Sequence, residues 1–160
     1  GKTVQKNDLE SDGLVFFREH RIRFQQELAR KTRGLPKSID KRLDLFCEKL
    51  ETLINLKDEK PALLHGDLWS GNHFASHDQV PYIFDPAVYF GLREADLAMT
   101  EMFGRLPEEF YSAYQEVFPT QPGYTERKDL YNLYHLLNHY NLFGGSYLEQ
   151  ADQTVRSFVD

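Results

Sequence analysis

Apolar residues recur every three or four positions along the first third of the chain, which is the period of a helix with one buried face. The first stripe ends where Gly34-Leu35-Pro36 interrupts the pattern, and it consists of Leu14, Phe17, Phe24 and Leu28. Ser38 is placed to cap a second helix, whose stripe consists of Ile39, Leu43, Phe46, Leu50 and Leu53. The pattern predicts a helix over residues 14–33 and another that starts at residue 38.

The later part of the chain changes from short extended runs to longer helical ones. Residues 72–76 and 80–84 flank the turn-forming His77-Asp78-Gln79, which predicts a β-hairpin. Helical patterns follow over residues 93–103, 108–118, 125–142 and 146–159. Residues 1–13 are polar and aperiodic, so we expect a flexible tail or linker remnant before one domain over residues 14–160. The predicted fold is mainly α with a small β-hairpin.

The candidate catalytic residues surround this hairpin. Residues 65–72 read His-Gly-Asp-Leu-Trp-Ser-Gly-Asn, and Asp85 follows the second predicted strand. This is the spacing of a kinase catalytic loop, in which an Asp and an Asn precede a second, metal-binding Asp. A lone His-Gly-Asp triplet is often only a turn. Here Asp67, Asn72 and Asp85 all stand at the ends of short strands, which favours a phosphoryl-transfer site.

The chemistry of phosphoryl transfer assigns a role to each of these side chains. A carboxylate must orient the acceptor hydroxyl and take its proton, and oxygen ligands must hold Mg²⁺ against the nucleotide phosphates. We assign the first role to Asp67. Asn72 and Asp85 supply hard oxygen ligands of the kind that Mg²⁺ binds, while other positions remain for phosphate and water. ATP and Mg²⁺ are therefore the expected cofactors.

The same motifs resemble one branch of the kinase-like superfamily. Gly66, in place of an Arg, is similar to the aminoglycoside phosphotransferase branch, and residues 64–72, 85–104 and 137–147 resemble the fructosamine kinase (ketosamine 3-kinase) family. The similarity runs from Leu14 to the end of the chain. It implies the C-terminal lobe of a protein kinase-like α+β fold. It also implies an ATP-dependent kinase that acts on a sugar hydroxyl of a ketosamine, either small or protein-bound.

Four neighbours of the motif are candidates for supporting roles. The resemblance implies that Asp96 braces the catalytic loop, with a helix-surface acid as the alternative. His65 precedes a turn, which favours a scaffold role over a catalytic one. Trp69 forms either a wall against a sugar ring or a contact that packs the loop onto the lobe. Glu94 is a candidate to bind a charged substrate group, with simple ion pairing as the alternative.

The nucleotide-gripping half of a kinase has no counterpart in this sequence. There is no G-x-G-x-x-G segment and no Lys in a V-A-I-K-like strand, the parts that hold the nucleotide phosphates. We therefore expect the chain to be the C-terminal lobe without its N-terminal lobe, and to be inactive by itself. We also expect an uncovered cleft floor around Ile83 and Phe84, through which the chain can self-associate.

Composition and charge argue against other functions and locations of the protein. The net charge of −6 argues against binding to nucleic acid, which needs a basic surface. No apolar run approaches the ~18 residues of a membrane-spanning helix. Cys47 is the only cysteine, which favours a reducing, cytoplasmic location, and its apolar neighbours favour a buried thiol over a reactive one.

Two alternatives to a ketosamine kinase stay open. Within enzymes, the runner-up is a kinase of another hydroxylated amine, as in aminoglycoside or choline kinases, because the spacing indicates only phosphoryl transfer. Outside enzymes, the isolated chain is a non-catalytic domain that binds an acceptor or a partner. His135 and His139 stand four apart on a predicted helix, but without the Glu of H-E-x-x-H they do not indicate a metal site.

Overall fold

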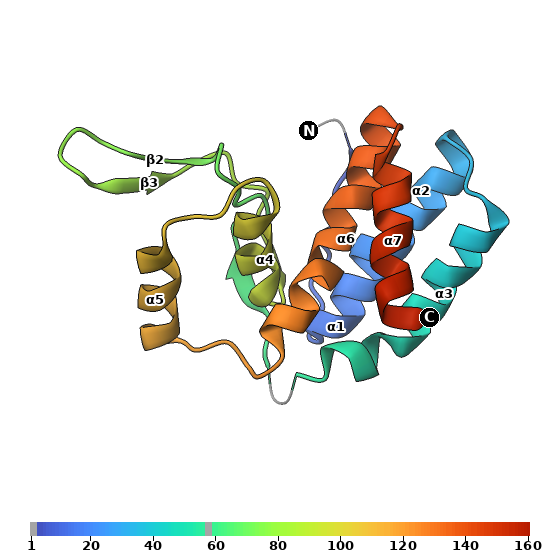
Figure 1. Cartoon of the computed structure of the whole chain (residues 1–160), viewed down its shortest axis with the longest axis horizontal. Coiled ribbons are helices and arrows are strands. Elements are labelled where there is room, and N and C mark those ends of the chain that lie inside the picture. Colours follow the sequence, from blue (N-terminus) through green and yellow to red (C-terminus); the bar gives the residue numbers. More distant parts are fainter. Residues whose placement is uncertain (1–2, 57–58) are drawn as a thin grey trace.

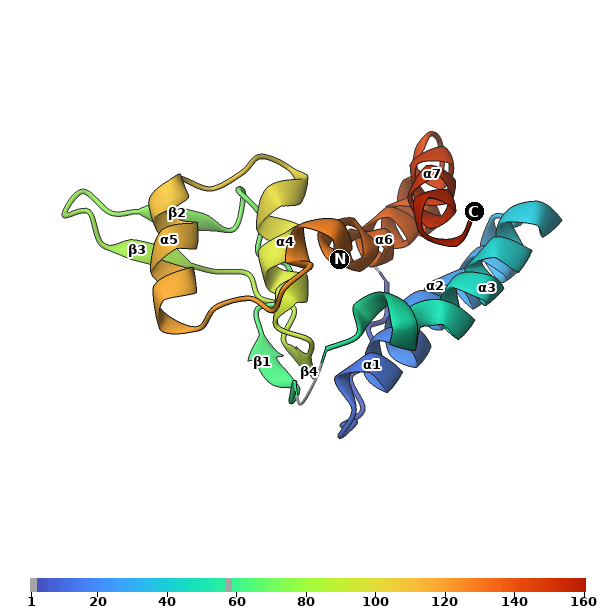
Figure 2. The same cartoon turned by 60° about the horizontal axis from the view of Figure 1, so that its bottom comes forward.

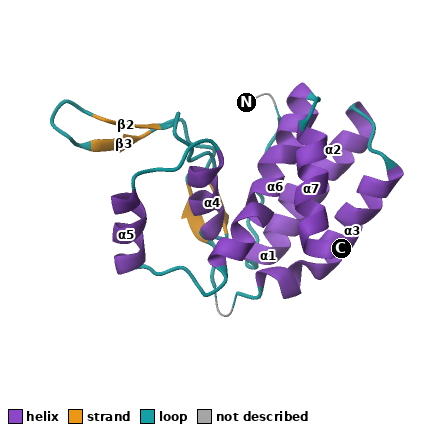
Figure 3. Ribbon diagram, in the orientation of Figure 1, coloured by secondary structure: helices purple, strands orange, loops and turns teal. Residues whose placement is uncertain are grey.

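The computed structural model describes residues 3–56 and 59–160, most of which are helical (Figure 3). One part contains α1 (Gly13–Phe16), a π-helical segment (Phe17–Arg23), α2 (Phe24–Thr32), α3 (Lys37–Ile54), α6 (Tyr124–Phe143) and α7 (Tyr147–Val159). The other contains β1 (Ala62–Leu64), β2 (His73–Ala75), β3 (Pro81–Ile83), β4 (Tyr89–Gly91), α4 (Glu94–Met102) and α5 (Glu108–Val117). The first part is a helical bundle, and α5 with the β2–β3 hairpin lies at the end of the molecule far from it (Figures 1 and 2). The prediction of a mainly α fold with a small β-hairpin is confirmed.

The helix predicted over residues 14–33 is present, but its middle is π-helical. Asp12 caps its start by accepting hydrogen bonds from the backbone nitrogens of Leu14 (2.8 Å) and Val15 (3.1 Å). The wider π turn shifts the inward-facing positions, so the predicted stripe is partly wrong. Leu14, Phe24 and Leu28 are only partly buried. The buried side chains of this helix beyond Gly13 are Phe16, Phe17, Arg21, Ile22, Gln25, Gln26 and Ala29.

The hydrophobic core lies among α3, α6, α7 and the first helix. The predicted stripe of α3 faces inward, and its central residues Leu43, Phe46 and Leu50 are fully buried. Cys47 lies on the same face, and burial raises the pKa of its thiol to about 12, so the buried structural thiol is confirmed. Within the described residues, no helix combines the length and the apolar character that crossing a membrane requires.

The start of α3 differs from the prediction. The helix begins at Lys37, directly after Pro36, and no side chain caps it, so the assignment of Ser38 as the N-cap is wrong. Proline suits the entry to a helix because its backbone dihedral is fixed and it has no N–H to leave unpaired. The chain thus enters α3 without the side-chain hydrogen bond that a serine cap supplies.

The predicted hairpin is present, and a second sheet that the sequence did not reveal accompanies it. In the hairpin, β2 and β3 are antiparallel and place His73 opposite Ile83. The second sheet pairs Leu64 of β1 with Tyr89 of β4, also antiparallel. The expectation that Asp67 stands at the end of a short strand agrees with β1. Strands this short contain too few residues for an alternating pattern, which explains why β4 and its pairing with β1 were not predicted. Because β1 leads into the catalytic-loop motif and β4 follows Asp85, this sheet joins the two ends of the site.

Candidate active site

The catalytic-loop motif turns sharply at Gly66, directly after β1. Gly66 has a φ of +80°, and a side-chain carbon there would lie 2.1 Å from the carbonyl oxygen of Ala87, so only glycine fits. From the first turn of α4, the Asp96 carboxylate accepts hydrogen bonds from the backbone nitrogens of His65 (2.6 Å) and Gly66 (2.8 Å). The turn is therefore held both by the tight contact with Ala87 and by Asp96.

Asp67 and Asn72 meet just beyond this turn. The amide nitrogen Nδ2 of Asn72 donates to the backbone oxygen of Asp67 (2.9 Å) and to its carboxylate oxygen Oδ2 (3.1 Å). Because Asn72 is only 5% exposed, its amide holds the carboxylate in one orientation. Within the described part of the chain, no hydrogen bond uses the amide oxygen Oδ1 of Asn72, which leaves that oxygen available as a ligand atom.

The surroundings of Asp67 raise the pKa of its carboxyl group above the usual value for aspartate. Partial burial is the main cause, and the negative charge of Asp85 acts in the same direction. The hydrogen bond from Asn72 opposes them. A carboxylate with a raised pKa is a stronger base, which suits a group that takes a proton from a hydroxyl.

His65 connects the catalytic loop to the residue that precedes Asp85. Its ring nitrogen Nε2 lies 3.0 Å from the backbone oxygen of Phe84, and its Nδ1 accepts a hydrogen bond from the backbone nitrogen of Asp67 at 3.3 Å. An accepting Nδ1 requires the proton on Nε2, so these partners assign a neutral ring that donates to Phe84. Both ring nitrogens are thus engaged by the backbone, which is a scaffold arrangement.

Asp85 follows β3 with an exposed side chain and a left-handed backbone, at a φ of +53°. Residues other than glycine are uncommon in that region and occur often at functional sites. Among the described residues, no hydrogen bond or ion pair involves the Asp85 carboxylate. The same residues contain no cluster of three or more His, Cys, Asp or Glu side chains that could bind a metal ion. Asp85 and the free Asn72 oxygen match the donor set of Mg²⁺, which keeps several positions for phosphate and water.

A cavity of about 200 Å³ adjoins Asp67. One wall comes from α6, through Tyr134, His135, Asn138 and His139. The opposite wall comes from Gly66, Asp67, Ala87 and Gln5. Gln5 belongs to the segment 1–13 that we expected to be a flexible tail. Residues 1 and 2 of that segment lie outside the described residues, while Gln5 donates a hydrogen bond to the backbone oxygen of Ala87 at 3.0 Å.

The two histidines of α6 are the part of the site that the sequence analysis missed. Burial lowers the pKa of His135 to about 3 and also lowers the pKa of His139, although the negative Asp67 acts against the latter shift. Both rings are therefore neutral near pH 7, and neutral imidazole both donates and accepts hydrogen bonds. Their spacing of four on one helix was the available signal, since it places them on one face.

Trp69 lies at the edge of the site with 36% of its surface exposed. Its ring packs edge-on against Phe103 at 6.0 Å between ring centres, and the Ser70 hydroxyl donates to the backbone oxygen of Phe103 at 3.0 Å. Phe103 in turn lies 5.6 Å from the ring of His139. The contact that packs the loop onto the lobe is therefore present, and the exposed part of the indole remains available to a ligand.

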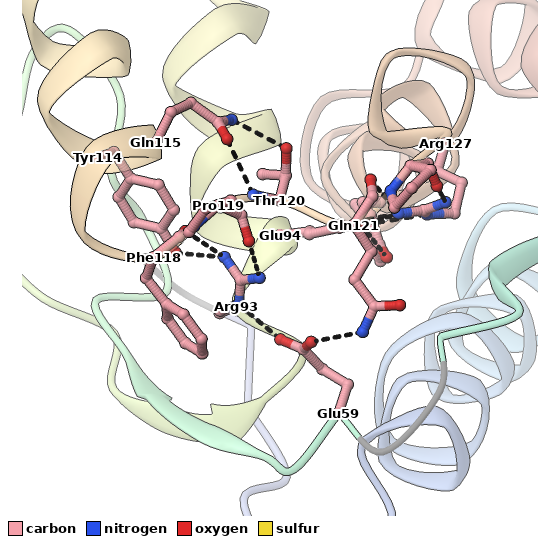
Figure 4. Close-up of polar contacts among 12 residues, drawn as sticks. Glu59, Arg93, Glu94, Tyr114, Gln115, Phe118, Pro119, Thr120, Gln121 and Arg127 are labelled. Carbon is pink, nitrogen blue, oxygen red and sulfur yellow. Dashed lines mark hydrogen bonds and ion pairs between the residues drawn. The ribbon is translucent and has the colours of Figure 1, made fainter.

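Glu94 does not face the site, so its candidate role as a substrate ligand is not supported. It is fully buried, and its carboxylate binds the guanidinium of Arg127 (2.8 Å) and the hydroxyl of Tyr131 (2.8 Å). The neighbouring Arg93 points the other way, where it pairs with Glu59 at 2.6 Å and donates to the loop after α5 (Figure 4). The alternative of ion pairing holds, in the protein interior instead of at the surface.

Comparisons with known proteins identify the family of this chain. The family model described as fructosamine kinase matches residues 1–160. A probable ketoamine kinase of Vibrio parahaemolyticus is 48% identical over 99% of this chain and 54% of its own length. A chloroplastic protein-ribulosamine 3-kinase of Oryza sativa subsp. indica is 43% identical over 99% of this chain and 46% of its own. The chain thus spans about half the length of these curated relatives.

Solved structures give the same result. The crystal structure of a putative fructosamine-3-kinase from Thermobifida fusca superposes with a TM-score of 0.89 at 34% identity, over 98% of this chain and 54% of that one. One from Haemophilus somnus gives a TM-score of 0.84 at 30% identity, over 100% of this chain and 54% of that one. The family model covers every residue, and the solved structures share the fold of this chain. The chain belongs to the fructosamine kinase family.

Proposed function

We propose that the full-length protein containing this chain transfers phosphate from ATP to a sugar hydroxyl of a ketosamine, with Mg²⁺ as the metal. One observation carries the proposal: a base of raised pKa, Asp67, adjoins both a cavity and the oxygen ligands of Asn72 and Asp85. Phosphoryl transfer needs the acceptor, the base, the metal and the nucleotide to lie next to one another in this spatial order. The reducing cytoplasm is the proposed location, because the lone buried thiol of Cys47 needs no partner there.

Each residue of the site has its own role in the proposed reaction. Asp67 orients the acceptor hydroxyl and takes its proton as the new bond forms between that oxygen and the terminal phosphorus, while the bond from phosphorus to ADP breaks. Asn72 keeps the Asp67 oxygen in place through the hydrogen bond of 3.1 Å. Asn72 Oδ1 and the Asp85 carboxylate would hold Mg²⁺, which would neutralise charge on the phosphates. Asp96 and His65 keep the loop in the conformation that brings these groups together.

The cavity supports a hydroxylated acceptor. Its walls present neutral polar groups, His135, His139 and Asn138, which match the alternating donors and acceptors of a sugar. The exposed part of Trp69 offers a flat apolar surface nearby, as sugar rings and their alkyl substituents require. The names of the relatives, ketoamine kinase and protein-ribulosamine 3-kinase, support a ketosamine carried by a small molecule or by a protein.

The test is an acceptor screen with the full-length protein. We expect Mg²⁺-dependent ADP release with fructosyl-lysine, and a phosphate on the sugar of the product by mass spectrometry. Choline and an aminoglycoside serve as competing acceptors of the other branches. Turnover confined to choline or the aminoglycoside would reject the ketosamine, and no turnover with any hydroxylated amine would reject the kinase.

The 160-residue chain alone is expected to show no kinase activity. Positioning and charge neutralisation supply nearly all of phosphoryl-transfer catalysis, and the sequence contains no glycine-rich loop and no phosphate-binding Lys of the kinase type. The heat of ATP turnover, measured by calorimetry of this chain and of the full-length protein with Mg-ATP, checks the result. ATP turnover by the chain alone at the full-length rate would show that the lobe is complete without a partner.

The hairpin face is expected to make the isolated chain self-associate. The β2–β3 hairpin projects from the molecule (Figure 1), and its apolar side chains Phe74, Tyr82, Ile83 and Phe84 are exposed, Ile83 at 63%. Phe74 packs against Tyr82 and Phe84 on one face of the hairpin, and Ile83 lies on the other face. Exposed apolar side chains gathered in this way mark an interaction surface, which we assign to the rest of the longer protein. Sedimentation of the chain at rising concentration measures the association, and Ile83→Lys is expected to weaken it. Val117→Lys, at an exposed apolar position on α5, is the control that leaves it unchanged.

A further inference from the structure

Among the residues that the structure describes, Arg21 is a buried cation without an acidic partner. It is fully buried, and no ion pair between the described residues includes it. Burying an unpaired charge is costly, so an arginine here indicates a specific task that an apolar side chain cannot perform. The π-helical segment that carries Arg21 points the same way, because such turns are rare and occur often at functional sites.

Aromatic rings of the active-site region surround the Arg21 charge. Its Cζ atom lies 4.0 Å from the ring centre of Tyr89, 4.5 Å from that of Phe16 and 5.2 Å from that of Tyr134. Tyr89 begins β4, just after the Asp85 loop, and Tyr134 lines the cavity beside Asp67. The charge therefore contacts Tyr134 of the cavity lining and Tyr89 of the strand that follows the Ala87–Val88 loop.

The same guanidinium anchors the segment that precedes α1. Its Nη1 donates to the backbone oxygen of Lys6 at 2.8 Å, and its Nη2 donates to the side-chain oxygen of Asn7 at 2.9 Å. A planar guanidinium can make both bonds at once because its donors form a rigid fork, whereas the ammonium group of lysine is a single point. Residues 6 and 7 are thus fixed from inside the protein.

The anchored segment in turn holds the loop after Asp85. The Asn7 amide donates to the backbone oxygen of Val88 at 3.0 Å, and the Gln5 amide donates to that of Ala87 at 3.0 Å. The backbone nitrogen of Ala87 donates to the oxygen of His65 at 2.8 Å. A chain of hydrogen bonds therefore runs from Arg21 through residues 5–7 and Ala87 to the catalytic loop.

We propose that Arg21 is a positioning residue for the acceptor: it fixes residues 5–7, and through them the Ala87–Val88 loop, as one wall of the cavity beside Asp67. The proposal rests on the proposed kinase function for its kinetic consequence. Of three wall residues, Tyr134 contacts Arg21 directly, Gln5 is linked to it through Asn7, and Ala87 is linked to it through Asn7 and Gln5. Because this wall lines the cavity proposed for the acceptor, a looser wall weakens binding of the acceptor more than binding of the nucleotide.

The kinetic test uses the full-length protein with the variants Arg21→Lys and Asn7→Ala. Asn7 is exposed, so its variant keeps the fold even if a change at Arg21 does not. We expect KM for fructosyl-lysine to rise by about ten- to a hundredfold in both, as for a misplaced substrate-positioning group, with KM for ATP unchanged. Arg23→Lys is the matched control, because Arg23 lies on the same helix and pairs with Asp44 at 2.9 Å away from the cavity.

A second readout needs no activity and separates this inference from the proposed function. Amide hydrogen exchange is expected to speed up at residues 85–88 in Asn7→Ala, while the core of α3 and α6 stays as protected as in the parent protein. A fall in kcat with both KM values unchanged would indicate mere loss of folded enzyme and would overturn the proposal. Unchanged exchange at residues 85–88 would overturn it as well, whatever acceptor the protein uses.

Discussion

Asp67→Asn is expected to lower kcat of the full-length protein by about two to four orders of magnitude, the usual contribution of a positioned proton acceptor. The substituted amide has the same shape, and its oxygen can still accept the hydrogen bond from Asn72 that is 3.1 Å long in the parent. The loop therefore stays in place while the base is removed. Steady-state kinetics with fructosyl-lysine at saturating ATP measures the loss.

The pH dependence of the same variant sharpens this test. The reactive form of Asp67 is the carboxylate, so the parent rate is full above the pKa of Asp67 and falls as the pH drops through it. Because burial raises that pKa, the acid limb is expected above the range of an ordinary aspartate, and it should vanish in Asp67→Asn. Asp78→Asn, in the exposed hairpin turn, should keep both the parent rate and the acid limb of the pH–rate profile. Parent-like turnover in Asp67→Asn would remove Asp67 from the mechanism.

Asp85→Ala is expected to abolish Mg²⁺-dependent turnover. It removes the charged ligand of the metal, and neither the Asn72 oxygen nor water replaces that charge. The carboxylate has no hydrogen bond or ion pair to another described residue, so the folded state loses no polar contact. Nucleotide binding by calorimetry, with and without Mg²⁺, measures the effect directly.

Asp85→Asn is the companion variant, because the backbone there is left-handed. Asparagine tolerates a positive φ far better than alanine does, so it separates loss of charge from backbone strain. Both variants should keep the parent melting temperature to within a few degrees, since a change of ~1 kcal/mol shifts it by about 2–4 °C in a domain of this size. Undiminished Mg²⁺-dependent binding in Asp85→Asn would show that the metal is held elsewhere.

The features predicted correctly are those that neighbouring residues encode. The motif around Asp67 and Asn72 is local, and the hairpin that delivers Asp85 is closed by a three-residue turn. The α3 stripe through Leu43 and Leu50 likewise needs only its own period to be recognised. These elements place Asp67, Asn72 and Asp85 in the fold without any knowledge of long-range contacts.

The features that escaped prediction depend on partners far away in the sequence. Glu94 was a candidate to bind a charged substrate group, and only its contact with Arg127, thirty-three residues later, shows that it forms a buried ion pair instead. The α6 wall of the cavity meets Asp67 only in three dimensions, so His139 carried no functional signal beyond its spacing. Arg21 interrupts an apolar stripe, and nothing local reveals the π turn that takes it inside.

The buried ion pair of Glu94 and Arg127 connects α4 to α6, the helices on the two sides of the candidate active site. Glu94 lies on α4, two residues before the Asp96 that holds the catalytic loop, and Arg127 lies on α6, the helix that carries His139. The ion pair thus joins α4, which holds the catalytic-loop turn through Asp96, to α6, which lines the cavity beside Asp67. Changes to the size of this cavity can therefore start from the interface of α4 and α6, with Asp67, Asn72 and Asp85 left untouched.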